Sequence, residues 1–129
     1  MLTDKPVILC IDDEEVPLKL RRMVLEKAGY DVVTACSGIQ ALEIVDSHHI
    51  DLVLSDHLMP GSKGTELARQ IKAFLPKVPF ILLSGVNEVP ADANCADMFL
   101  SKLEGPRVLC EIVEHFLISS SKRQQDYCT

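Results

Sequence analysis

The stretch of sequence that decides the fold is Leu52-Val53-Leu54-Ser55-Asp56, an apolar run that ends on an acidic residue. A short apolar run of this kind predicts a β-strand, and the run at residues 6–11 is typical of a strand buried on both faces of a parallel sheet. Three other short runs also lead into polar side chains: Val7–Ile11 into Asp12 and Asp13, Pro79–Leu83 into Ser84, and Met98–Ser101 into Lys102. If these runs are parallel strands, their polar ends meet at one edge of one sheet.

Segments with helical periodicity alternate with the strand-like runs, and this alternation indicates βαβ units. The expected strands cover residues 6–11, 31–35, 51–55, 79–83 and 97–101, and the expected helices cover residues 14–28, a segment capped by Ser37, a segment ending before Pro76, and a segment starting at Gly105-Pro106. The fold class is therefore α/β, a doubly wound five-stranded parallel sheet flanked by helices. We expect one domain over residues 1–118 and a frayed, polar C-terminal tail over residues 119–129.

The interval between the last two strands is irregular. A parallel connection needs a dozen or more residues, and a helix usually fills it. Here residues 85–97 contain Pro90 and two asparagines, which oppose a long helix. We therefore expect the fourth helix to be short or irregular.

Composition excludes several classes of partner. The formal net charge is -6, whereas binding to nucleic acid or an anionic membrane needs an excess of Lys and Arg. No apolar stretch approaches the ~20 residues of a membrane span, and the N-terminus lacks the apolar core of a signal peptide. The five cysteines show no C-x-x-C spacing. We expect a cytoplasmic protein with reduced thiols.

The polar residues at the strand ends have complementary chemistry. Asp13 and Asp56, with Asp12 acting through a water molecule, supply the hard oxygen ligands that Mg²⁺ prefers. A carboxylate beside Mg²⁺ can also attack phosphorus, which makes Asp56 a candidate phosphoacceptor. Lys102 can neutralise the oxygens of a phosphoryl group as a point charge, and the Ser84 hydroxyl can donate a hydrogen bond to it.

Each of these residues also has a purely structural interpretation. Asp12 and Asp13 could cap a helix, and Asp56 could be an ordinary turn aspartate. The functional interpretation rests on complementary groups following four separate strands. The pair His48-His49 is a weaker metal candidate, because adjacent side chains point in different directions and no third ligand is suitably spaced.

Three sequence motifs together resemble the response-regulator receiver domain of bacterial two-component signalling. They are Ile8-Leu9-Cys10-Ile11-Asp12-Asp13-Glu14, Ala35-Cys36-Ser37-Gly38-Ile39-Gln40-Ala41-Leu42, and Asp56-His57-Leu58-Met59-Pro60-Gly61 with Gly64-Thr65-Glu66-Leu67. The resemblance covers about residues 6–118.

This resemblance implies a flavodoxin-like receiver fold with five helices, and a function as a phosphorylatable switch rather than an enzyme. Asp56 would accept a phosphoryl group from a sensor histidine kinase or a phosphotransfer protein, with Mg²⁺ as cofactor. The backbone carbonyl of Leu58 would join Asp12, Asp13 and Asp56 around the metal. Ser84 and Phe99 would form the switch that alters contacts with a protein target.

The sequence departs from the family in two places. Leu103 follows Lys102 where a proline is usual, and a cis bond before leucine would cost about 3 kcal/mol. This makes the placement of Lys102 a question for the structure. The interval from Ser84 to Lys102 is also shorter than usual by about one helical turn.

Several functions remain open on this evidence. The leading hypothesis is a stand-alone signalling receiver, and the first alternative is an intermediate phosphate carrier or sink in a phosphorelay. A small aspartate-dependent phosphatase would need an acidic residue two positions after its nucleophile, and Leu58 occupies that position. A degenerate scaffold that never takes phosphate is disfavoured by the intact set of polar residues.

Overall fold

The structure, a computed structural model, describes residues 5–56, 58–59, 62–85 and 96–127. Along the chain its elements are β1 (Val7–Ile11), α1 (Glu15–Lys27), β2 (Asp31–Ala35), α2 (Gly38–Ser47), β3 (Leu52–Asp56), β4 (Leu58–Met59), β5 (Ser62–Lys63), α3 (Gly64–Phe74), β6 (Phe80–Ser84), β7 (Met98–Ser101) and α4 (Pro106–Tyr127).

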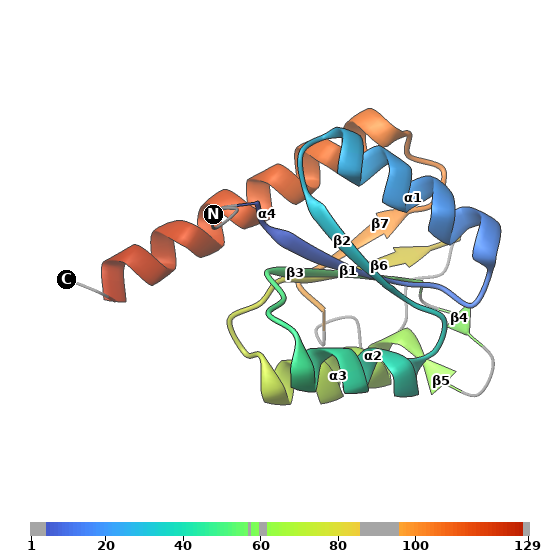
Figure 1. Cartoon of the computed structure of the whole chain (residues 1–129), viewed down its shortest axis with the longest axis horizontal. Helices are drawn as coiled ribbons and strands as arrows, with labels where there is room; N and C mark the ends of the chain where they lie inside the picture. Colours follow the sequence, from blue (N-terminus) through green and yellow to red (C-terminus); the bar gives the residue numbers. More distant parts are fainter. Residues whose placement is uncertain (1–4, 57, 60–61, 86–95, 128–129) are drawn as a thin grey trace.

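The main sheet has five parallel strands in the order β2-β1-β3-β6-β7. The winding reverses between β1 and β3, so helices cover both faces: α1 and α4 lie on one face, and α2 and α3 lie on the other (Figure 1). Each pair of helices packs on its face of the sheet through one cluster of buried apolar side chains. The predicted doubly wound α/β fold is confirmed.

The strand boundaries differ slightly from those expected. β3 extends to Asp56, and β6 extends to Ser84, so both polar residues are the last residues of their strands. The described residues contain four helices, whereas the resemblance implied five. The segment expected to hold a short or irregular helix falls mainly in residues 86–95, which lie outside the described residues.

The last helix is longer than expected. We expected a frayed tail over residues 119–129, but the backbone of α4 is helical as far as Tyr127. The polar part of this helix contains good helix formers such as Lys122 and Gln124, and no glycine or proline follows Pro106 within it. The polar composition of residues 119–127 therefore does not end the helix.

Local sequence explains where the first two helices begin or end. Gly29 has a φ of 103°, a left-handed conformation that suits glycine and ends the helix α1. Ser37 caps α2 by accepting a hydrogen bond from the Gln40 N–H at 3.1 Å, and the Gln40 side chain accepts one from the Cys36 N–H at 2.7 Å. Gly29 precedes the start of β2, and Ser37 follows its carboxyl end.

An aspartate ties the start of β6 to the start of β7. Asp97 accepts a hydrogen bond from the buried Phe80 N–H at 2.7 Å and forms an ion pair with Lys72 at 2.6 Å. Lys72 also donates to the Val78 carbonyl at 2.7 Å. This network fixes the end of α3 against the sheet.

Replacing Asp97 with alanine is expected to lower the free energy of unfolding by about 2 kcal/mol, because the Phe80 N–H loses its acceptor in a buried position. Urea denaturation measures this change. Asp46→Ala on the exposed face of α2 is the matched control. Equal stability of the two variants would contradict the structural role of Asp97.

Cys10 is a buried thiol in the middle of β1. Burial raises the pKa of Cys10 to about 12; the nearby Arg21 opposes this effect, and the charge of Asp12 adds to it. Because the thiolate is the reactive form, we expect Cys10 to resist alkylation up to about pH 10 while the protein is folded. The exposed Cys36 should react in the same sample. Mapping iodoacetamide adducts by mass spectrometry tests this, and equal labelling rates would contradict it.

Candidate functional site

Parallel strand register brings the polar residues together. Ile11 is aligned with Ser55, and Asp56 is aligned with Leu83, so β1, β3 and β6 end at the same edge. Asp12 follows β1, Asp56 ends β3, and Ser84 ends β6. The sheet therefore positions these side chains through main-chain pairing alone.

Three carboxylates form a compact acidic cluster at this edge. Oxygen atoms of Asp12, Asp13 and Asp56 all lie within 4.8 Å of one another, and no other cluster of potential metal ligands occurs among the described residues. Asp12 and Asp56 are only 2% and 3% exposed, whereas Asp13 is exposed. Buried carboxylates this close repel each other unless cations compensate them.

Lys102 supplies one of these cations. Its Nζ lies 2.6 Å from Asp56 Oδ1, and the lysine side chain is 38% exposed. The Lys102 N–H donates to the Ser84 carbonyl at 2.8 Å, which places the lysine directly beyond the pairing of β6 with β7. The ammonium therefore points into the acidic cluster.

The replacement of the usual proline by Leu103 does not displace Lys102. No cis peptide bond occurs in the described part of the chain. Instead, the Leu103 N–H donates to Ser101 Oγ and the Glu104 N–H donates to the Ser101 carbonyl, both at 3.1 Å. These two hydrogen bonds build the turn after β7 in place of a proline.

Arg21 is a second cation at the site, and the sequence interpretation missed it. Its Nη1 lies 2.7 Å from Asp12 Oδ2. The spacing carried a signal: Arg21 lies three residues after Leu18 and four before Leu25, and the structure shows both leucines buried. An arginine on the core-facing stripe of a helix needs a charged partner.

The other residues named from the sequence do not belong to the acidic cluster or lie outside the described residues. Phe99 is a partly buried residue of β7 that packs against the core. Leu58 lies in the short strand β4, two residues after Asp56, and His57 lies outside the described residues. His48 contacts Ser47, and His49 contacts Asp51 at 2.9 Å, so neither histidine belongs to the acidic cluster.

The acidic cluster fits a hard divalent cation. Asp56 Oδ1 is fully buried and has no hydrogen-bond donor in suitable geometry among the described residues, although Lys102 approaches it as an ion-pair partner. Carboxylate oxygens are the ligands that Mg²⁺ prefers. The cluster of three carboxylates therefore suits this ion.

The chain matches the family model described as response regulator receiver domain over residues 8–114. The transcriptional regulatory protein GlrR of Escherichia coli is 36% identical over 126 residues, which is 93% of this chain and 28% of GlrR. The autoinducer 1 sensor kinase/phosphatase LuxN of Vibrio harveyi is 36% identical over 80 residues, which is 62% of this chain and 9% of LuxN. The chain thus spans less than a third of either relative.

Solved structures show the same fold. A CheY-like response regulator receiver domain protein from Methanospirillum hungatei superposes with a TM-score of 0.87 at 26% identity, over 93% of this chain and 99% of that one. The response regulator protein TrrA from Thermotoga maritima, solved in complex with Mg²⁺-BeF, has a TM-score of 0.80 at 31% identity, over 86% and 98% of the two chains. No described helix of the present chain has the length and apolar character needed to cross a membrane.

Proposed function

Because the chain belongs to the response regulator receiver domain family, we propose that it is a signalling switch whose phosphoacceptor is Asp56. One observation carries this assignment. Asp56 ends the central strand β3, and its carboxylate lies among two further carboxylates and the Lys102 ammonium. It is the one carboxylate of the cluster that contacts the lysine.

The proposed reaction is transfer of a phosphoryl group from a phosphohistidine. A carboxylate oxygen of Asp56 forms the new P–O bond while the P–N bond breaks, and the histidine nitrogen keeps the bonding electron pair. Lys102 neutralises the transferred oxygens, and the Ser84 hydroxyl donates a hydrogen bond to one of them. Two observations support these roles: Ser84 ends β6, which pairs with β3, and Lys102 follows β7, which pairs with β6.

Asp13 and Asp56 would hold Mg²⁺, with Asp12 and the backbone carbonyl of Leu58 completing the protein contribution. When bound, the ion neutralises charge on the phosphoryl oxygens. The clustering of the three carboxylates and the exposure of Asp13 support this assignment. The Mg²⁺-BeF complex of TrrA shows such an ion in a relative that is 31% identical.

The partner classes follow from the family. Receiver domains interact with sensor histidine kinases or phosphotransfer proteins. Beside the site, α1 exposes Val16, Leu20 and Met23, which are spaced along one face of the helix. This apolar stripe supports a protein as the phosphodonor, because exposed apolar patches of this kind mark contact surfaces.

The output would be a change of protein contacts. We infer that Ser84 moves toward the phosphoryl group and that Phe99 reorients behind it. Ser84 and Phe99 lie on the neighbouring strands β6 and β7, in which Leu82 is aligned with Phe99. This pairing of the two strands supports the coupling. New charge at Asp56 would bias the position of this pair.

A direct experiment is incubation with Mg²⁺ and acetyl phosphate, followed by intact-mass measurement. One added phosphoryl group is expected, and hydroxylamine should remove it because acyl phosphates react with this nucleophile. A parallel sample with EDTA should show little uptake. Failure to gain phosphate in Mg²⁺, or a product that resists hydroxylamine, would refute the proposal.

A further inference from the structure

We propose that Arg21 is a built-in counter-ion of the acidic cluster that competes with Mg²⁺ and thereby lowers the affinity of the site for the metal. The inference rests on the proposed function, since it concerns the same site. In this role Arg21 sets the affinity of the acidic cluster for the metal.

The geometry of Asp12 is the first argument. Its Oδ2 contacts Arg21 Nη1 at 2.7 Å, and its Oδ1 accepts a hydrogen bond from the Glu14 N–H at 2.9 Å. Both carboxylate oxygens are therefore already engaged. The residue is buried, and the Arg21 side chain is only 16% exposed, so water screens their attraction weakly.

Charge balance is the second argument. Arg21 compensates Asp12, and Lys102 compensates Asp56, so two of the three carboxylates have a cationic partner. The cluster keeps about one uncompensated negative charge, on Asp13. A divalent ion would bind more tightly to the same carboxylates with one cation fewer, because like charges in a partly buried site repel strongly.

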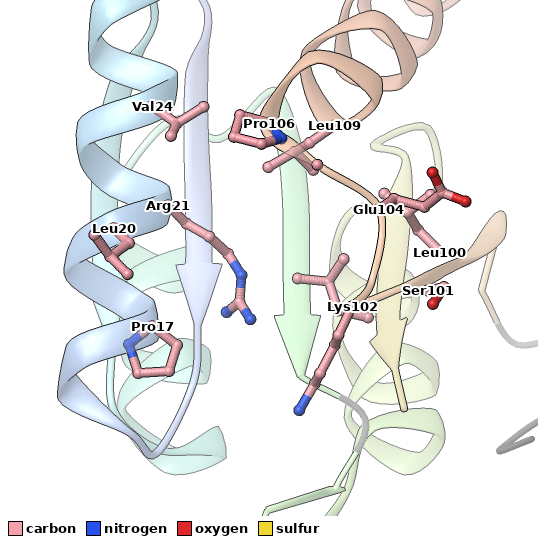
Figure 2. Close-up of a pocket in the computed structure, with 12 residues that line it drawn as sticks. Pro17, Leu20, Arg21, Val24, Leu100, Ser101, Lys102, Glu104, Pro106 and Leu109 are labelled. Atoms are coloured by element: carbon pink, nitrogen blue, oxygen red, sulfur yellow. The ribbon is translucent and has the colours of Figure 1, made fainter. Parts of the chain in front are cut away.

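The position of Arg21 in α1 explains how it reaches the cluster. Helical side chains tilt toward the N-terminus of their helix. α1 begins directly beyond the carboxyl end of β1, so this tilt carries the guanidinium toward Asp12. Figure 2 shows Arg21 and Lys102 reaching from α1 and from the turn after β7 toward the same end of the sheet. The neighbouring Arg22 points elsewhere and pairs with the exposed Glu26 at 3.3 Å.

A cavity beside the pair gives the arginine room to leave. It has a volume of about 280 Å³ and lies between α1 and the start of α4, with Arg21 and Lys102 in its lining (Figure 2). Its other lining residues include Leu20, Val24 and Leu109. A displaced guanidinium can enter this space with its aliphatic stem against apolar groups. Metal binding and the position of Arg21 are thus coupled, and the coupling is reciprocal.

Arg21 could instead assist metal binding by orienting Asp12. The Glu14 N–H already holds this carboxylate, so orientation survives without the arginine. Removal of a positive charge is then the larger effect, and the sign of the change in affinity distinguishes the two roles.

The test is isothermal titration of Mg²⁺ into the wild type and three variants, since the chain has no tryptophan to report binding. Arg21→Gln removes the charge and keeps a hydrogen-bond donor; we expect Mg²⁺ to bind on the order of tenfold more tightly. Arg21→Lys keeps the charge and should stay within about threefold of the wild type. Arg22→Gln, one residue away on the exposed face, is the matched control and should leave affinity unchanged.

A second readout is the melting temperature. In EDTA, where no metal is bound, Arg21→Gln should melt at a lower temperature than Arg22→Gln, because Asp12 has lost its cationic partner. Mg²⁺ should raise the melting temperature of Arg21→Gln more than that of the wild type, because the variant binds the ion more tightly. Equal or weaker Mg²⁺ binding by Arg21→Gln, alongside measurable binding by the wild type, would overturn the competition and leave the metal site standing. Absence of Mg²⁺ binding in every variant and in the wild type would overturn both.

Discussion

Asp56→Asn is expected to abolish phosphoryl uptake from acetyl phosphate, a loss on the order of a hundredfold or more. The amide is nearly the same shape as the carboxylate but is a poor nucleophile toward phosphorus. The fold should persist, because Lys102 is partly exposed and can be solvated when its partner loses charge. Intact-mass measurement after incubation with Mg²⁺ gives the yield, and circular dichroism confirms the fold.

The control for this variant is Asp46→Asn. Asp46 is an exposed residue in the last turn of α2 and does not belong to the acidic cluster. It should take up phosphate like the wild type. Full uptake by Asp56→Asn would mean that another residue is the acceptor, and peptide mapping of the phosphate would then show whether Asp12 or Asp13 replaces it.

Asp13→Asn is expected to weaken Mg²⁺ binding by at least about tenfold. Asp13 is exposed, and the structure shows Arg21 on Asp12 and Lys102 on Asp56, so Asp13 offers the least compensated oxygens of the cluster. Its loss removes both a ligand and the remaining negative charge. Calorimetric titration measures the affinity, with Asp46→Asn again as the control.

The Asp13 and Arg21 variants should move the affinity for Mg²⁺ in opposite directions. One removes a negative charge from the cluster, and the other removes a positive charge beside it. Unchanged affinity in Asp13→Asn would contradict the proposed set of ligands, whatever the result for Arg21.

The arrangement of the strand-end residues could be predicted from the sequence. Short apolar runs separated by helical segments dictate a parallel sheet, and a parallel sheet gathers the ends of its strands at one edge. Asp12, Asp56 and Ser84 therefore lie where their positions after or at the ends of the apolar runs place them. The Ser37 cap of α2 was readable for the same reason, because a helix cap is a local signal. Apolar spacing did not identify the buried face of α1: Leu18 and Leu25 are buried, whereas Val16, Leu20 and Met23 are exposed.

Tertiary structure decided the features that depend on packing between distant segments. Lys102 reaches Asp56 without a proline because Ser101 organises the turn, which no local pattern revealed. Arg21 meets Asp12 because α1 packs with that face toward the sheet and its side chains tilt back to the strand end. The sequence by itself determined which chemical groups meet at the carboxyl edge of the sheet. Only the tertiary structure decided which cation lies on which carboxylate, because a 2.7 Å contact depends on helix rotation and side-chain direction rather than on spacing along the chain.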